Sequence, residues 1–153
     1  MIADFNACRN PNNTQSGTVA MPAGGTFIFD SSAGPWQDGG CIGSITITNG
    51  AQYCDIGTGV NYDWTTYSSV NLYYKSPTAS MTFYVDLTGY LGYPAIYGPI
   101  TASVNWQCVT IPKTSFTLNC PCTSVQFFSN ITDILIEPQE AGTLKIDNVT
   151  LSQ

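Results

Sequence analysis

The sequence predicts an all-β domain, a β-sandwich or barrel of about eight or more short antiparallel strands. Strand-like segments recur at short intervals, separated by clusters of Gly, Pro, Asn and Ser. No segment has a sustained helical period of apolar residues, and Thr, Ser, Asn and Tyr are favoured over Lys, Glu and Ala. Charged residues make up 9 % of the chain and hydrophobic residues 43 %, which argues against disorder. The 153 residues fit one domain, residues 1–153.

The predicted strands follow from alternation and from turn signals. Residues 44–48 alternate cleanly and stop at Asn49-Gly50, a strong turn pair. Residues 81–87 alternate again, with the apolar side chains on one face. The expected strands are residues 26–30, 44–48, 70–74, 81–87, 106–111, 124–128, 131–137 and 143–151. Residues 88–99 carry three Tyr among Gly and Pro without a two-residue period, so we expect a loop or an irregular edge there.

Six cysteines and three N-x-S/T sequons indicate a secreted, extracellular glycoprotein with disulfides. The sequons begin at Asn12, Asn130 and Asn148. A zinc site is disfavoured because the chain has no His and no two CxxC pairs. We expect Cys41 to pair with Cys54. Cys108 would pair with Cys120 or Cys122, and Cys8 with the remaining cysteine, because Cys120-Pro121-Cys122 is too tight to close without strain.

The charge balance excludes two classes of partner. The net charge is −6 and only four residues are Lys or Arg, so the surface would repel a phosphate backbone and we expect no nucleic-acid partner. No apolar run is long enough to span a bilayer, and no basic amphipathic stretch could lie on one. We therefore expect no membrane association, and we expect a monomer.

Four motifs occur in order along nearly the whole chain. They are Asp-Phe-Asn at residues 4–6, Asp-Trp-Thr-Thr-Tyr at 63–67, Trp-Gln-Cys-Val-Thr-Ile-Pro at 106–112 and Lys-Ile-Asp-Asn-Val-Thr-Leu at 145–151. This ordered set resembles the jelly-roll carbohydrate-binding modules of the galactose-binding-like superfamily. The resemblance implies a jelly roll and a structural calcium ion, for which the candidate ligands are Asp4, Asn6 and Asp147. Asn6 stands at the position of the usual glutamate, and its neutral side chain weakens the implied site.

The sequence argues against catalysis. His, the usual acid–base group near neutral pH, is absent, and there is no G-x-S-x-G nucleophile motif. Paired carboxylates could still hydrolyse a glycoside, but we expect the strand and turn carboxylates to be solvated surface residues. These candidates are Asp55, Asp63, Asp86, Asp133, Glu137 and Glu140.

Sugar binding is favoured by the aromatic content, which is 12 % of the chain with nine Tyr and three Trp. A pyranose offers an apolar face to an aromatic ring and a rim of hydroxyl groups to polar side chains. Strand parity places Tyr73, Tyr84 and Asp86 outward, and we expect adjacent strands to bring Tyr73 and Tyr84 onto one outer sheet face. The full set of predicted carbohydrate-binding residues is Tyr73, Tyr84, Asp86, Gln126, the loop residues Tyr90, Tyr93 and Tyr97, and Trp36.

The hypothesis from the sequence is non-catalytic binding of a neutral polysaccharide, a β-glucan or another cell-wall glycan. The low content of charged residues suits a neutral polymer better than an anionic one. A flanking catalytic domain in the parent protein is a possible partner. Two alternatives stay open, namely an extracellular structural or adhesive domain with a protein partner, and a small polysaccharide-degrading enzyme.

Overall fold

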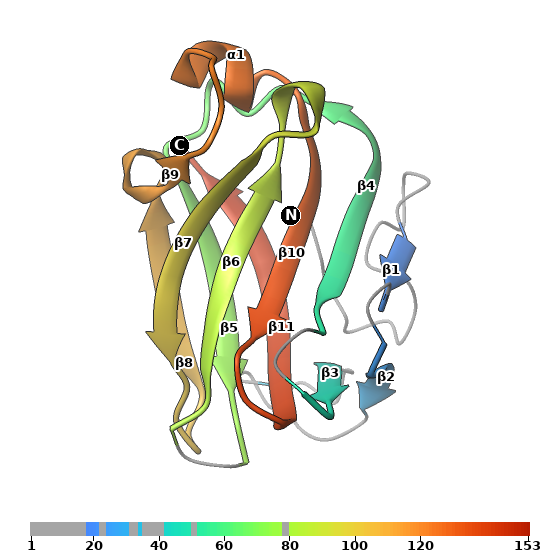
Figure 1. The fold of residues 1–153 in the computed structure, drawn as a ribbon. Coiled ribbons are helices and arrows are strands. Elements are labelled where there is room, and N and C mark those ends of the chain that lie inside the picture. The colour runs from blue at the N-terminus through green and yellow to red at the C-terminus, as the bar shows by residue number, and fades with distance from the viewer. Residues whose placement is uncertain (1–17, 22–23, 31–33, 35–41, 50–51, 78–79) are drawn as a thin grey trace.

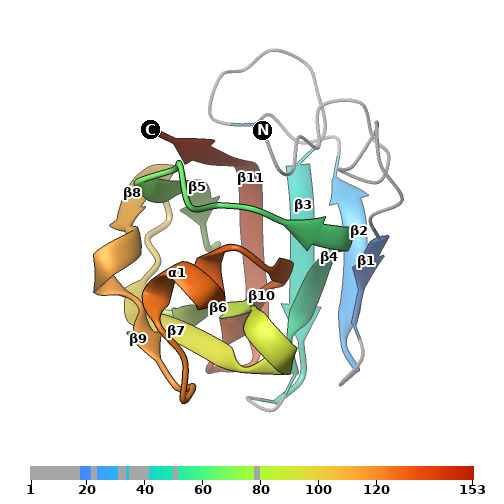
Figure 2. The same ribbon diagram turned by 90° about the horizontal axis from the view of Figure 1, so that it is seen from above.

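The fold is an antiparallel β-sandwich, as the sequence predicts. The computed structural model describes residues 18–21, 24–30, 34, 42–49, 52–77 and 80–153. Within these ranges, eleven strands form two sheets that face each other (Figures 1 and 2). No helix in the described part of the chain is long and apolar enough to cross a membrane.

The six-stranded sheet has the order β1-β4-β10-β6-β7-β9 and the five-stranded sheet the order β2-β3-β11-β5-β8, with every pair antiparallel. The six-stranded sheet contains β1 (Thr18–Ala20), β4 (Cys54–Tyr62), β6 (Thr82–Thr88), β7 (Pro94–Thr101), β9 (Thr117–Leu118) and β10 (Ile131–Pro138). The five-stranded sheet contains β2 (Thr26–Asp30), β3 (Ile42–Ile47), β5 (Ser69–Lys75), β8 (Gln107–Pro112) and β11 (Gly142–Ser152). In the part of the chain that the structure describes, three short helices lie between strands, η1 (Tyr90–Gly92), η2 (Lys113–Ser115) and α1 (Ser124–Phe128).

The core fills the space between the sheets, mostly with alternate residues of the strands β5, β6, β10 and β11. Phe83, Val85 and Leu87 of β6 are fully buried, and Tyr74 of β5 meets Phe83 across the sandwich, with ring centroids 5.0 Å apart. Such edge-to-face pairs add to the free energy gained from apolar burial. The alternation also determines which side chains form the outer face of each sheet, because the residues between the buried ones must project away from the core.

Several segments differ from the sequence-based expectation, and β1, β4 and β9 are strands that the sequence pattern did not predict. Residues 124–128, expected as a strand, form α1, because the Thr123 side chain accepts a hydrogen bond from the Gln126 backbone N–H and the Gln126 side chain accepts one from Thr123 N–H. This reciprocal capping box starts a helix. Residues 88–99, expected as a loop or an irregular edge, contain η1 and most of β7, which pairs with β6 through a register shift and with β9 on its other side.

The expected disulfide pairing is wrong in the part of the chain that can be checked. Cys120 and Cys122 are bonded to each other, so the tight Cys-Pro-Cys segment does close. Cys54 and Cys108 are free thiols, whereas Cys8 and Cys41 lie outside the described residues. Burial, with a smaller contribution from the Asp55 charge, raises the pKa of Cys54 to about 12, so this thiol stays protonated and unreactive.

Candidate functional site

The outer face of the six-stranded sheet gathers four carboxylates from three neighbouring strands. Asp55 of β4 and Asp86 of β6 lie on either side of Leu135 on the central strand β10. Asp133 and Glu137 come from β10 itself, and Glu137 lies opposite Tyr84. Because their chain neighbours point into the core, these side chains project to the outer face. Strand pairing therefore assembles a site from residues far apart in the sequence.

Two carboxylate oxygens in this cluster are buried and lack a hydrogen-bond partner in the described structure, Oδ1 of Asp55 and Oδ1 of Asp86. Asp86 is only 6 % exposed although it belongs to the outer face. A buried acceptor without a partner costs about 1–3 kcal/mol, and more when it is charged. The arrangement is therefore complementary to a ligand that brings hydroxyl or N–H donors to this face.

The same burial changes the acidity of these groups. Burial raises the pKa of Asp86 to about 7, with a smaller contribution from the charge of Glu137. Burial raises the pKa of Asp55 to about 6, with a smaller contribution from the charge of Asp133. The pKa of Glu137 is also raised by burial. The cluster therefore carries less negative charge near neutral pH than four ordinary carboxylates would.

The lysines of the described chain are engaged elsewhere. Lys113 donates to the carbonyl oxygens of Trp64 and Thr65 at 3.2 and 2.9 Å. Lys75 lies over the ring of Trp106, with Nζ 4.8 Å from its centroid. Lys145 pairs with Asp30 at the opposite face. None of these three lysines neutralises the carboxylate cluster.

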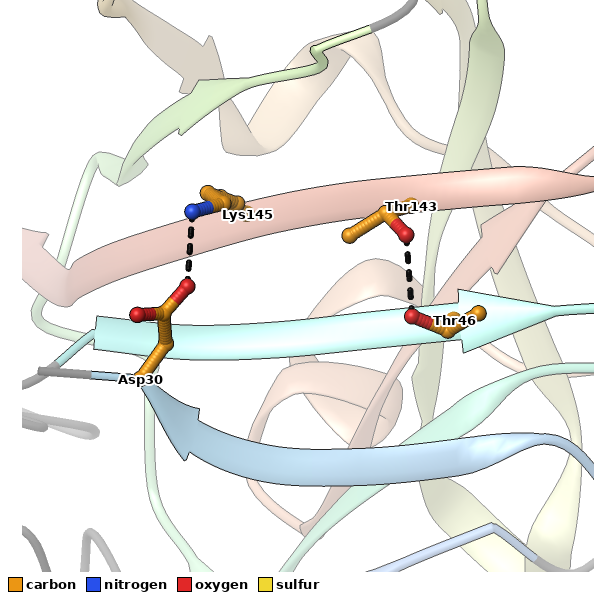
Figure 3. Close-up of polar contacts among 4 residues, drawn as sticks. All are labelled: Asp30, Thr46, Thr143 and Lys145. Atoms are coloured by element: carbon orange, nitrogen blue, oxygen red, sulfur yellow. Dashed lines mark hydrogen bonds and ion pairs between the residues drawn. The ribbon is translucent and has the colours of Figure 1, made fainter. Parts of the chain in front are cut away.

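The outer face of the five-stranded sheet has a different organisation. Lys145 Nζ lies 2.6 Å from Asp30 Oδ2, and the hydroxyl oxygens of Thr46 and Thr143 are 2.9 Å apart (Figure 3). Tyr73 of β5 also projects to this face, opposite Asp147 on β11 and Cys108 on β8. In Figure 3 the two threonines bond between the adjacent strands β3 and β11, whereas the Lys145–Asp30 ion pair spans β3 and joins β11 with β2.

The expectation that Tyr73 and Tyr84 share one sheet face is wrong. Both point outward from their strands, as parity predicts, but β5 pairs with β11 and β8 whereas β6 pairs with β10 and β7. The two tyrosines therefore lie on opposite faces of the sandwich. Alternation shows which side chains point away from the core, but it carries no information about which sheet a strand joins.

The other predicted binding residues are dispersed. Gln126 is exposed on α1, but its side chain is engaged in the capping box rather than lying on a sheet face. Tyr97 turns toward the core, with its ring 5.9 Å from that of Phe116, so it does not join Tyr90 and Tyr93 in one exposed loop. Tyr90 is half-buried in η1 and Tyr93 is exposed. Trp36 lies outside the described residues.

Sequence reasoning set aside three members of the cluster as solvated residues, namely Asp55, Asp133 and Glu137. Parity along residues 131–137 could have placed Asp133 and Glu137 on one face with Leu135. Asp55 carried no such signal, because β4 contains glycines and was not predicted as a strand.

One of the three predicted calcium ligands can be located. Asp147 is fully buried on β11, next to a register shift, and its Oδ1 accepts a hydrogen bond from Asn148 N–H at 2.8 Å. Asp4 and Asn6 lie outside the described residues. Among the residues that are described, no group of three His, Cys, Asp or Glu side chains could hold a metal ion. Calcium therefore stays a prediction.

No family model and no curated protein matches this sequence. Solved structures do match its fold. The family 11 carbohydrate-binding module from Clostridium thermocellum, in complex with a β-1,3-1,4-mixed-linked tetrasaccharide, has a TM-score of 0.67 at 15 % identity over 94 % of this chain and 92 % of that chain. The family 30 module of a cellulosomal cellulase of Clostridium thermocellum has a TM-score of 0.66 at 13 % identity, covering 91 % and 94 %.

An exo-β-agarase has a TM-score of 0.73 at 15 % identity, covering 98 % of this chain but 24 % of that chain. This chain thus resembles one part of that larger protein. The resemblance noted in the sequence is confirmed at the level of fold, and the chain has the jelly-roll β-sandwich fold of carbohydrate-binding modules.

Proposed function

We propose that the outer face of the six-stranded sheet binds a neutral polysaccharide, with β-glucans as the first class to test. The observation that carries this proposal is the pair of buried, unpartnered oxygens on Asp55 and Asp86. Sugar hydroxyl groups are suitable donors for such acceptors, because hydrogen bonds to charged groups are the stronger ones.

Apolar side chains on the same face support sugar over a purely polar ligand. Tyr84 lies beside Glu137, and Leu135 and Ile96 flank Asp86 across the strands. Ile96 is 37 % exposed. A sugar ring can place its C–H face on such surfaces while its hydroxyl groups reach the carboxylates. An anionic polymer would be repelled, because no described lysine lies on this face.

The module acts by binding alone in this proposal, as a secreted monomer. Its role is then to hold an attached enzyme or a cell surface close to the polymer, which raises the effective concentration of the reactants. The match to about a quarter of an exo-β-agarase supports a parent protein with a catalytic domain.

Calorimetric titration against a glycan panel tests the proposal. The panel contains mixed-linked β-glucan, β-1,4- and β-1,3-gluco-oligosaccharides, agaro-oligosaccharides and an anionic polyuronate. We expect binding to at least one neutral member, a loss of about tenfold or more in Tyr84→Ala, and no change in the matched control Tyr73→Ala on the opposite face.

Three results would count against the proposal. Absence of binding to every neutral glycan would remove it. Equal loss in the two tyrosine variants would show that the effect is not specific to the six-stranded face. Release of new reducing ends from the panel would replace it with the enzymatic alternative.

A further inference from the structure

A hollow of about 390 Å³ lies at the end of the six-stranded sheet, where β6 passes into η1, β4 ends and β10 begins. Its walls are made by Asn61, Tyr90, Leu91, Asn130 and Thr132, together with two glycines of the β6–β7 connection. Its volume falls within the usual range for small-molecule sites, about 300–1,000 Å³. The carboxylate cluster does not include any of these residues.

The hollow continues the proposed binding face. Asp133 pairs with Thr88 in the last regular row of that face, and the next pair along β10 and β4 is Ile131 with Tyr62. The register shifts between these rows, so Thr132 and Asn61 lie at the irregular end of the sheet. Figures 1 and 2 show the β6–β7 connection at this end, on the same side as α1. A ligand lying along the outer face would therefore reach the hollow.

One wall of the hollow is held in a fixed conformation. Gly89 N–H donates to the Tyr93 carbonyl oxygen at 3.0 Å and Gly92 N–H to that of Gly89 at 2.9 Å, which closes the turn. A Cβ on Gly89 would lie 2.8 Å from ring carbons of Phe127, so only glycine allows η1 to pack this closely on α1. Between Gly89 and Gly92, Leu91 has a left-handed backbone (φ 54°) and is 79 % exposed. Such strained non-glycine residues concentrate at functional sites.

The facing wall presents positioned hydrogen-bonding groups. The Asn130 side-chain NH₂ donates to the Gln126 carbonyl oxygen at 3.3 Å and to Ser129 Oγ at 2.8 Å. Its amide oxygen is an acceptor by nature and is held in place by these two bonds. The Thr132 hydroxyl donates to the Thr88 carbonyl oxygen at 3.3 Å. The wall is thus built before any ligand arrives, which lowers the entropic cost of binding.

The chemistry of the lining selects the class of ligand. None of the lining residues is charged, so a phosphate or a carboxylate would find no counter-charge there. Two amides, a hydroxyl and the phenol ring of Tyr90 offer hydrogen bonds together with one flat apolar surface. A Cβ built at Gly92 would meet nothing within 4 Å, so the hollow is open beside this residue.

We propose that this hollow is a subsite for one uncharged pyranose unit, at the end of the glycan that lies on the six-stranded face. This inference rests on the proposed function and extends the binding site beyond the carboxylate cluster. The affinity of the module then continues to rise with oligosaccharide length after the sheet face is filled.

Titration with gluco-oligosaccharides of increasing length tests the subsite, using the linkage that the natural protein binds. The protein is produced in bacteria, so that Asn130 carries no glycan. For the longest oligosaccharide we expect Asn61→Ala and Tyr90→Ala to lower the association constant about threefold to tenfold. For the shortest oligosaccharide that binds, we expect no change. Asn119→Ala, an exposed asparagine outside the hollow, is the matched control and should behave as the natural protein at every length.

The unaltered protein provides a second readout that does not depend on any variant. In amide NMR spectra, we expect the Gly92 resonance to shift with the longest oligosaccharide and not with the shortest. Unchanged constants at every length in both hollow variants, with binding still lost in Tyr84→Ala, would overturn the subsite and leave the proposed function standing. An equal loss at every length would also overturn it. Absence of any glycan binding by the natural protein would overturn both.

Discussion

The two outer faces of the sandwich handle their polar side chains differently. On the five-stranded sheet, Lys145 pairs with Asp30 and Thr46 bonds to Thr143, so other strands of the same sheet supply the partners. On the six-stranded sheet, Asp86 and Asp55 each bury an oxygen that has no partner in the described structure. The first arrangement stabilises the fold, whereas the second lowers stability until a ligand supplies the missing donors. Aspartate thus stabilises the fold on the five-stranded face and is available to a ligand on the six-stranded face.

The largest difference between the two faces should appear in glycan binding, when one aspartate on each face is replaced. Asp86→Ala removes an acceptor for the ligand, and we expect a loss of about tenfold to a hundredfold in the association constant. Asp30→Ala, on the opposite face, should leave the constant unchanged. Calorimetry on the tightest-binding glycan measures both. Equal behaviour of the two variants would contradict a functional difference between the faces.

The five-stranded sheet carries Asp147, the one predicted calcium ligand that lies among the described residues. The resemblance implies a structural ion, and an ion bound only by the folded state adds about 2.7 kcal/mol of stability at one hundred times its Kd. We therefore expect a chelator to lower the Tm by several degrees in the natural protein and to have no such effect in Asp147→Asn. A Tm that is the same with calcium and with chelator would contradict the prediction of a structural calcium ion.

The free energy of unfolding should respond to pH through the six-stranded face. Asp86 has a pKa of about 7 in the folded protein and about 3.9 when unfolded. Between these values the folded state holds a proton that the unfolded state has lost, so stability falls as pH rises from about 4 to about 7.

Asp86→Asn removes this titration. We expect the variant to be about 1–2 kcal/mol more stable than the natural protein at pH 8 and to lose much of the decline between pH 4 and 7. Urea unfolding at several pH values measures both quantities. If the natural protein instead gained stability over that range, the assignment of a raised pKa to Asp86 would be wrong.

Replacing aspartate by asparagine on the five-stranded face should instead lower the free energy of unfolding, and by a smaller amount. Asp30→Asn breaks the contact with Lys145, whose side chain and that of Asp30 are 18 % and 23 % exposed. We expect a loss of about 0.5–1 kcal/mol in the free energy of unfolding. The loss should shrink at high salt, because screening weakens an ion pair that is partly exposed. A stabilising effect would contradict the comparison between the faces.

Local sequence signals predicted much of the fold. The strands β6 and β10 occur where the pattern placed them, and in β6 the residues predicted to point inward, Phe83, Val85 and Leu87, are buried. The signal failed where it was weak or ambiguous. β4 mixes glycines with polar residues, and α1 carries Val125 and Phe127 in a spacing that also suits a strand. There the Thr123–Gln126 capping box decided the outcome.

The candidate site was less predictable than the fold. Tyr84 and Asp86 were expected to point outward, and they do, but Asp86 is buried among its neighbours on the outer face rather than solvated. Nothing in the local pattern indicated that Asp55 would lie two strands away from Asp86, because β4 and β6 are joined only through β10.

The sequence by itself determined an all-β fold, the side of each well-marked strand that turns away from the core, and a surface poor in cations. These are properties of alternation and composition, which each segment carries locally. Only the tertiary structure decided that Tyr73 and Tyr84 lie on opposite faces and that four carboxylates meet on one of them. Strand order and register depend on packing between distant segments, and that information is not present in any single strand.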